Sequence, residues 1–406
     1  MEKEFFGKTK DGIEISKYTL ENTNGIKASF LNYGGILQSL SVADKEGGFI
    51  DVVLGFDDIW AYENNDCFLG AFVGPNANRI GNARYKIDGE EYRLEVNDGE
   101  NNLHSHMTKG YHNRIFRSVS FEEMETVLKD FDYSDDKAAK DKEHILENKV
   151  DYVIFYLKDE EDFGFPGKKD VFVIYSLNNR NELVIEYKII SDKKSIINPT
   201  NHSYFNLDGH KSGDAMGQHL RFYSQKISKI DKNLIPTGEI MDISGTALDF
   251  SGRKTVGKDL QFLDKEYDFN DLNEAHKQIV LAKGYDHNYI VNKSDDEVKQ
   301  AEQMFYYNFT NRIRKKEDFV LNKVAELASS NWKVRMMVLT DRPCIQFYSG
   351  NFLNGLKGKE GATYEMRSGL CFESQGYPDS ENHKEFESNI IEAGEVFEST
   401  TVYRFL

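Results

Sequence analysis

Residues Val171 to Leu177 read Val-Phe-Val-Ile-Tyr-Ser-Leu, and residues Leu183 to Ile190 read Leu-Val-Ile-Glu-Tyr-Lys-Ile-Ile. Both runs consist mainly of β-branched and aromatic residues, which favour strands. The polar residues from Asn178 to Glu182 between them are typical of a hairpin connection. This stretch therefore predicts two strands joined by a hairpin in a mainly β protein.

Similar signals recur along the chain in both directions from this hairpin. Each expected strand is rich in β-branched and aromatic residues or is bounded by turn residues such as Asp-Gly. The expected strands are Val150–Leu157, Trp332–Thr340, Thr400–Leu406, and Ile36–Val42 with Asp51–Leu54 around a loop at Asp44–Gly48. A further tight turn is expected at Ile87-Asp88-Gly89-Glu90, between short strands.

Convincing amphipathic helices are few, and two charged stretches are the exceptions. Residues 119–149 and 293–323 combine dense charge with helical composition, so they are expected to be short, solvated helical insertions between strands. The rest favours an all-β fold, a many-stranded sandwich in which residues 1–406 form a single domain.

Composition limits the partners and the location of the protein. No apolar run is long enough to span a bilayer, and the first residues do not have the pattern of a signal peptide. The three cysteines, Cys67, Cys344 and Cys371, are widely spaced, which is typical of a reduced, cytoplasmic protein. The net charge of −17 disfavours nucleic acid and anionic membranes as partners. A neutral small molecule would not be repelled by this negative charge.

The richest polar segment is Asn201-His202-Ser203-Tyr204-Phe205-Asn206-Leu207. Histidine has an unperturbed pKa of about 6.5, so His202 is suited to proton transfer near neutrality. Its polar neighbours could fix its tautomer and bind a polyol. A purely structural histidine is the competing interpretation.

Four other clusters contain residues that could contribute to a site. Asn78 and Arg79 lie in a glycine-bounded loop, and Asp286 lies in a polar stretch beside an apolar pair, although both could be ordinary turns. Glu373 follows the start of an expected strand and points either into a cleft or into water.

The fourth cluster contains His104 and His106, which would share one face of a strand and could bind a metal with His112. Because no carboxylate follows at a useful spacing, a hydrogen-bonding role for His104 is favoured and no metal is expected. Neither Gly350–Lys359 nor any other stretch fits a nucleotide-binding motif, so no cofactor is expected either.

Taken in order along the chain, these segments resemble the signatures of the aldose 1-epimerase (galactose mutarotase) family. The matching segments are Asn32–Gly35, Leu54–Asp57, Ala77–Ile80, Asn102–His104, Asn201–Leu207, Gly284–Asn288, Gln346–Phe352 and Glu373–Gln375. The resemblance implies a large antiparallel β-sandwich, a galactose mutarotase-like supersandwich, with an open sugar cleft. It does not cover the two charged insertions.

The resemblance also implies roles for individual residues. His202 matches the general acid of the family and Glu373 the general base. The matched sugar-binding positions are Arg79, His104, Asp286, Asn78, Tyr204 and Gln346. The sequence departs from the family pattern at Pro75, Ser105, His106 and Cys344, which bears on substrate preference more than on the acid–base pair.

The implied function is interconversion of the α and β anomers of free hexoses such as galactose and glucose. One base and one acid on opposite sides of the sugar suffice for ring opening and closure, and a carboxylate such as Asp286 near His202 would favour the imidazolium. The alternatives are a non-catalytic sugar-binding protein on the same fold and an epimerase of another, phosphorylated sugar. The protein is expected to be a monomer or a homodimer.

Overall fold

The computed structural model describes residues 1–129, 150–292 and 321–406 of the chain. Within these residues, nine strands form the largest sheet, in the order β11-β12-β13-β14-β30-β24-β23-β18-β21. All of its pairings are antiparallel. Its strands are β11 (Arg117–Val119), β12 (Asp151–Asp159), β13 (Lys169–Leu177), β14 (Glu182–Ser191), β30 (Val396–Phe405), β24 (Arg335–Thr340), β23 (Asn322–Ala328), β18 (His219–Phe222) and β21 (Lys254–Thr255).

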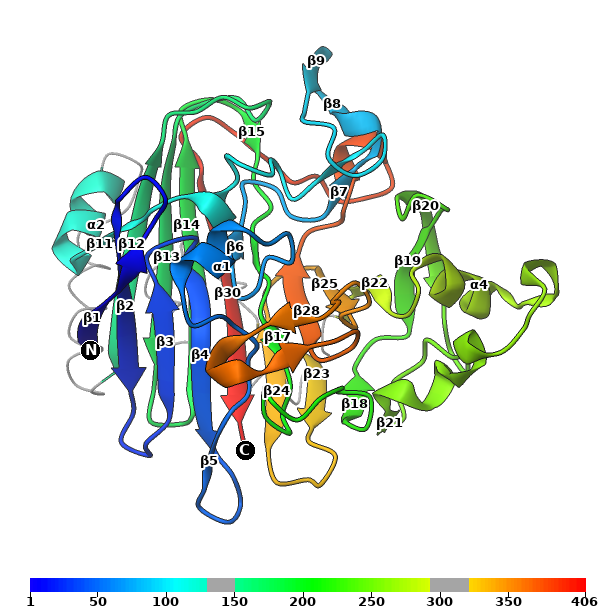
Figure 1. Cartoon of the computed structure of the whole chain (residues 1–406). Helices are drawn as coiled ribbons and strands as arrows, with labels where there is room; N and C mark the ends of the chain where they lie inside the picture. The colour runs from blue at the N-terminus through cyan, green and yellow to red at the C-terminus, as the bar shows by residue number, and fades with distance from the viewer. Residues whose placement is uncertain (130–149, 293–320) are drawn as a thin grey trace.

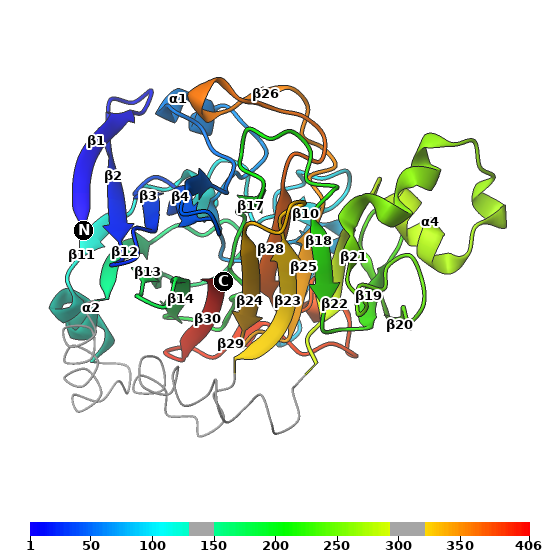
Figure 2. The same ribbon diagram turned by 90° about the horizontal axis from the view of Figure 1, so that it is seen from below.

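Two further antiparallel sheets pack against the largest one, as the views in Figures 1 and 2 show. The five-stranded sheet comprises β1 (Glu2–Lys8), β2 (Glu14–Glu21), β3 (Lys27–Leu31), β4 (Ile36–Ala43) and β5 (Phe49–Asp51). The six-stranded sheet has the order β17 (Tyr204–Phe205), β28 (Leu370–Gln375), β25 (Cys344–Tyr348), β22 (Asp286–Ile290), β19 (Lys226–Ile230) and β20 (Pro236–Asp242).

Aromatic side chains join these layers into one core. Phe30 of β3 stacks on Tyr175 of β13, with ring centroids 4.2 Å apart. Phe222 of β18 stacks on Tyr289 of β22, with centroids 4.3 Å apart. A single cluster of buried apolar residues includes members of all three large sheets. Burial of this apolar surface is the main stabilising contribution to such a fold.

Short two-stranded ribbons and helices connect the large sheets. The ribbons pair β10 (Asn102–Leu103) with β7 (Arg79–Ile80), β15 (Ser195–Ile196) with β29 (Ile390–Ile391), β16 (Thr200–Asn201) with β6 (Phe72–Val73), β26 (Leu356–Lys357) with β27 (Thr363–Tyr364), and β8 (Arg84–Ile87) with β9 (Glu90–Arg93). The α-helices are α1 (Ile59–Glu63), α2 (Phe121–Leu128) and α4 (Glu274–Leu281). The 3-10 turns are η1 (Gly81–Ala83), η2 (Tyr111–Asn113), η3 (Val256–Asp259), η4 (Gln261–Asp264), η5 (Phe269–Asp271), η6 (Lys359–Gly361) and η7 (Ser380–Asn382). No helix in the described part of the chain is long and apolar enough to cross a membrane.

The predicted strands are found with small differences at their ends. The opening hairpin is β13 and β14, and the Asp-Gly turn joins β8 to β9 with Asp88 and Gly89 at positive φ. The strand expected from Trp332 begins only at Arg335, because Trp332 adopts a positive φ and donates its N–H to the carbonyl of Ser329 in a tight turn. The strand expected at Asp51–Leu54 is instead Phe49–Asp51.

The beginning of the first charged insertion differs from the solvated helix expected there. Ser120 caps α2 by a reciprocal capping box with Glu123, and the side chains of Phe121, Met124 and Leu128 are buried against β12 and β13. The helix therefore covers an apolar patch of the sheet. The remainder of this insertion, residues 130–149, and residues 293–320 of the second lie outside the described residues.

Candidate active site

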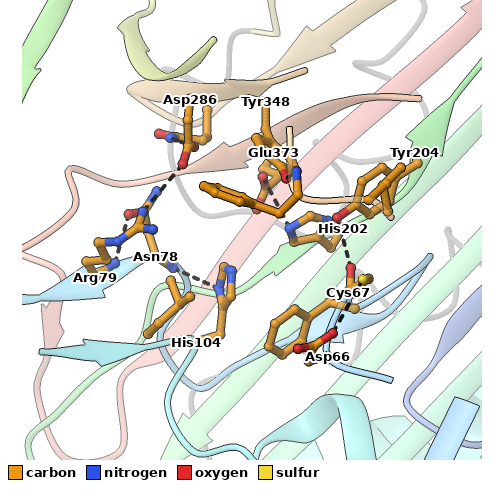
Figure 3. A pocket seen from close by; sticks show the side chains of 15 residues that line it. Asp66, Cys67, Asn78, Arg79, His104, His202, Tyr204, Asp286, Tyr348 and Glu373 are labelled. Carbon is orange, nitrogen blue, oxygen red and sulfur yellow. Dashed lines mark hydrogen bonds and ion pairs between the residues drawn. The ribbon is translucent and has the colours of Figure 1, made fainter. Parts of the chain in front are cut away.

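A cavity opens over one face of the six-stranded sheet. It encloses about 690 Å³ of space when its open mouth is included. The cavity is lined by all eight residues predicted from the sequence: Asn78, Arg79, His104, His202, Tyr204, Asp286, Gln346 and Glu373. Figure 3 shows their side chains converging from segments that are far apart in the sequence.

Strand register explains why half of these residues share one face. Gln346 of β25 lies directly opposite Glu373 of β28, and Tyr204 of β17 lies opposite Cys371. Asp286 of β22 lies opposite Tyr348, two positions from Gln346 and therefore on the same face. Because side chains alternate between the two faces of a sheet, Phe372 and Phe347 point the other way and join the core. The alternation of polar and aromatic residues in these strands thus builds the floor of the cavity and the core beneath it.

The side chains of His202 and Glu373 lie side by side in the cavity. His202 Nε2 is 3.7 Å from Glu373 Oε1, and the two residues are 5% and 2% exposed. The expectation that acid and base stand on opposite sides of the sugar is wrong in this respect. Neighbouring positions still suffice, since the hydroxyl and ring oxygens of a hemiacetal are bonded to the same carbon.

Burial dominates the electrostatics of this pair. It lowers the pKa of His202 to about 4 and raises the pKa of Glu373 well above its usual range, with the Asp286 carboxylate adding to the rise. The expected rise in the pKa of His202 from Asp286 is not found, because burial of the imidazole dominates.

Asp286 is held by two neighbours on the cavity wall. Gln346 Nε2 donates to Asp286 Oδ1 at 2.6 Å, and Arg79 Nη1 lies 3.6 Å from Asp286 Oδ2. Arg79 also donates from Nε to Asp98 Oδ2 at 2.7 Å. The guanidinium is therefore fixed between two carboxylates and presents its remaining N–H groups in a set orientation.

His104 is oriented by the backbone of Asn78. Both residues have positive φ, 53° and 64°, and the N–H of Asn78 donates to His104 Nδ1 at 3.1 Å. The hydrogen of the neutral ring consequently lies on Nε2, which makes Nε2–H a donor into the cavity. The expectation that His104 sits in a strand is wrong, because the ribbon strand β10 ends at Leu103.

This tautomer decides against a metal at the site. Among the described residues, His104, His202 and Glu373 form one group whose potential ligand atoms lie within 4.8 Å of one another. A ring nitrogen that carries a hydrogen cannot coordinate a cation, so the group suits hydroxyl binding better. The pairing of His104 with His106 that the sequence suggested is not seen, since His106 Nδ1 lies 3.3 Å from Glu95 Oε2.

Two buried acceptors in the cavity have no hydrogen-bond partner among the described residues. They are Gln346 Oε1 and Glu373 Oε2. Buried polar atoms are nearly always paired in folded proteins, so such atoms indicate groups that a ligand satisfies. Together with the His104 Nε2–H, they offer complementary partners to sugar hydroxyls.

Several residues that line the cavity were not predicted from the sequence. They are Asp66, Cys67, Phe68, Leu103, Tyr348, Phe352 and Leu353. Phe68 has a φ of 55° and its ring contacts the rings of His104, His112 and His202. Bulky residues rarely adopt this conformation, and it often occurs at functional sites, but nothing in the sequence marks it.

The chain is similar to known proteins over nearly its whole length. The family model described as aldose 1-epimerase matches residues 16–404. The galactose mutarotase of Bos taurus is 31% identical over 392 residues, covering 96% of this chain and 94% of the bovine protein. The aldose 1-epimerase of Escherichia coli K12 is 29% identical over 399 residues, covering 98% of this chain and 96% of that protein.

Solved structures show the same fold. An aldose epimerase homologue from C. elegans superposes with a TM-score of 0.74 at 24% identity, covering 96% of this chain and 98% of that one. Galactose 1-epimerase from Lactobacillus acidophilus gives a TM-score of 0.72 at 24% identity, covering 100% of this chain and 98% of that one.

Proposed function

The chain belongs to the aldose 1-epimerase family and is an isomerase of the anomeric carbon of sugars, and we propose that His202 and Glu373 carry out its proton transfers. The substrates proposed are free hexoses such as galactose and glucose, in keeping with the relatives named galactose mutarotase. The observation that carries the assignment is the 3.7 Å approach of His202 Nε2 to Glu373 Oε1 inside the cavity.

The reaction opens and recloses a hemiacetal. Glu373 takes the proton of the anomeric hydroxyl, the C1–O bond to the ring oxygen breaks, and His202 Nε2 gives a proton to that oxygen. Rotation about the bond between C1 and C2 turns the aldehyde, and closure on its other face reverses both transfers. Positioned acid–base groups of this kind contribute about 10²–10⁴-fold each.

One proton on the pair is enough for this cycle. In the free site the two pKa shifts favour the state with that proton on Glu373, whereas ring opening needs it on His202. Hydrogen bonds from sugar hydroxyls to the unpaired Glu373 Oε2 stabilise the carboxylate and so favour transfer of the proton to the imidazole. Sugar binding thereby prepares the pair for catalysis.

The remaining predicted residues are proposed to bind sugar hydroxyls. Arg79, His104 and Asn78 are assigned as donors, while the Asp286 carboxylate and the free Oε1 of Gln346 are assigned as acceptors at the opposite wall. Tyr204 stacks on His202 with ring centroids 5.0 Å apart and supports it from one face.

The charges of the cavity favour a neutral sugar over a phosphorylated one. Among the described residues that line it, Arg79 is the one permanently charged cation, and two carboxylates already engage it. Asp66 adds a further negative charge near the mouth. A phosphate would meet no free cation there, so the phosphorylated-sugar alternative is not favoured.

We also propose that residues 1–406 form one domain, since a single apolar cluster includes all three large sheets. All three cysteines are free thiols, which supports a cytoplasmic location. A monomer or a homodimer is proposed, and light scattering coupled to gel filtration distinguishes them.

The test of the proposed roles is polarimetry on freshly dissolved α-D-galactose and α-D-glucose. His202→Asn and Glu373→Gln are each expected to lower kcat by about 10²–10⁴-fold. His219→Asn and Glu239→Gln change the same residue types outside the cavity and should leave kcat unchanged. Retention of wild-type rates by either cavity variant would show that its role is misassigned.

A non-catalytic sugar-binding protein remains a distinguishable alternative, although the family relatives do not favour it. Such a protein would bind galactose in a calorimeter and leave the spontaneous rate of mutarotation unchanged. The proposed enzyme accelerates that rate at catalytic concentrations.

A further inference from the structure

Strand β28 contacts both nitrogens of the His202 ring. Cys371 and Glu373 are two positions apart on this strand, so their side chains share the face that carries the cavity. Cys371 Sγ lies 3.5 Å from His202 Nδ1, while Glu373 Oε1 lies 3.7 Å from Nε2. The imidazole, visible beside Glu373 in Figure 3, is thus bracketed by two residues of the same strand.

The other contacts of the ring restrain its plane but not its flip. His202 stacks with Tyr204 at an interplanar angle of 27° and with Phe68 at 25°. Rotation of an imidazole by half a turn keeps it in the same plane, so stacking allows both orientations equally. The flipped ring would present a carbon atom to Glu373 and would lose its protonatable nitrogen there.

The chemistry of the sulfur identifies which nitrogen carries the hydrogen. The imidazolium that ring opening requires carries hydrogen on both ring nitrogens, so its Nδ1–H faces the Cys371 sulfur at 3.5 Å. When Nε2 has given up its proton, the remaining ring hydrogen lies on Nδ1, the nitrogen beside Cys371. Burial raises the pKa of the Cys371 thiol well above its usual range, so the sulfur stays neutral and can accept this hydrogen weakly.

We propose that Cys371 is a positioning residue, whose sulfur accepts the Nδ1–H of His202 and keeps Nε2 directed at Glu373 and the sugar. The proposal rests on the proposed role of His202 as the acid. It assigns to the thiol no proton transfer and no contact with substrate. Its effect is to hold one ring orientation and to favour the imidazolium that ring opening requires.

The test compares Cys371→Ala and Cys371→Ser with Cys344→Ala. Cys344 is equally buried, at 0% exposure, and lies on the neighbouring strand β25, whereas the contact with His202 Nδ1 is made by Cys371. Cys371→Ala is expected to lower kcat roughly threefold to tenfold, the effect of one neutral hydrogen bond, with KM changed less than about twofold. Its pH–rate profile should have its acid limb at lower pH than the wild type, because the imidazolium has lost an acceptor.

Serine retains an acceptor at the same position, so Cys371→Ser should recover most of the kcat and the wild-type acid limb. Cys344→Ala should change the melting temperature without changing kcat or the profile. If Cys371→Ala differs from Cys344→Ala in stability alone, the positioning role is overturned.

Two further measurements distinguish the positioning role of Cys371 from the role of His202 as the acid. In a His202→Asn background, Cys371→Ala should cause no additional loss of kcat, because the partner of the sulfur is gone. An undiminished rate in His202→Asn itself would refute the acid assignment rather than the role of Cys371. On the unmodified protein, 15N NMR of the histidines should report hydrogen on Nδ1 of His202, and hydrogen on Nε2 instead would contradict the proposal without any variant having to fold.

Discussion

Individual side chains of the cavity set the acidity of its reacting groups through burial. His202 and Glu373 both lie almost entirely out of solvent, and each is shifted toward its neutral form. The sequence could predict both residues from their motifs, because the motif fixes residue identity. It could not predict the direction of the shifts, which depends on how deeply the neighbouring strands enclose the pair.

The pH dependence of kcat/KM follows from these shifts. The pair is active with one proton bound, so activity falls at low pH when a second proton adds to His202, whose pKa is about 4. It falls at high pH when Glu373, with its raised pKa, loses the only proton. Initial-rate polarimetry, corrected for the spontaneous reaction at each pH, is expected to give a bell with its acid limb near pH 4. An acid limb near the ordinary histidine value would contradict the buried, neutral imidazole.

Asp98 is a residue that sequence reasoning missed, since nothing in its local sequence connects it with Arg79. Its Oδ2 accepts from Arg79 Nε at 2.7 Å and so fixes the guanidinium. Asp98→Asn weakens this charge-assisted bond and is expected to raise KM about threefold to tenfold with little change in kcat. Asp88→Asn, which removes a surface ion pair with Lys194, serves as the control in the same Michaelis–Menten measurement. A loss confined to kcat would show that Asp98 acts on the chemical step instead.

Among the elements, those with strong local signals were the ones the sequence predicted well. The hairpin of β13 and β14 and the turn between β8 and β9 are confirmed because their turn residues specify them locally. The segment around Phe68 and the ribbon of β7 and β10 could not be predicted, because distant contacts determine them. The observed ends of a strand differ from the expected ones where a tight turn replaces strand residues. At Trp332, for example, such a turn delays the start of β24 to Arg335.

Helix α2 offers a test at the scale of one element. Ser120 Oγ accepts the N–H of Glu123, and Glu123 Oε2 accepts the N–H of Ser120. Ser120→Ala removes the cap and is expected to lower the free energy of unfolding by about 1 kcal/mol, measured by urea denaturation, with no effect on mutarotation. Ser118→Ala, on the exposed side of β11, should change the free energy by less. Equal effects of the two substitutions would show that the cap contributes nothing.

At the scale of the whole molecule, buried histidines make the fold sensitive to acid. Burial lowers the pKa of His112, His202 and His287 to about 4 in the folded state. Unfolded histidine titrates near 6.5, so between these values the unfolded chain binds more protons and stability falls as pH decreases. Glu373 and Asp286, whose pKa values are raised, act in the opposite direction.

The free energy of unfolding is expected to fall by about 1.5 kcal/mol for each of these histidines between pH 6.5 and 5, before the carboxyl groups offset part of the loss. Urea denaturation at pH 7, 6 and 5 measures the change. His287→Gln should reduce the slope of the free energy of unfolding against pH by the contribution of one titrating group. This holds whatever the substitution does to the stability at pH 7. A free energy of unfolding that is constant over this range would contradict the prediction.

The residues themselves indicated a many-stranded sandwich, and the family resemblance added that it is large and antiparallel. Which sheet covers which depends on matching aromatic surfaces such as Phe30 on Tyr175, and no local pattern encodes that pairing. The six-stranded sheet could not be anticipated at all from neighbouring sequence, since β17, β28, β25 and β22 come from widely separated segments.

Strand β30 lies in the middle of the nine-stranded sheet, between β14 and β24, although its residues follow those of every other strand described. During synthesis on the ribosome, β14 and β24 therefore keep unpaired edges until residues 396–405 have left the exit tunnel and β30 can pair with both. Unpaired edges of this kind invite association with other chains. A nascent chain stalled before residue 396 should accordingly depend on chaperones, and a released one should not.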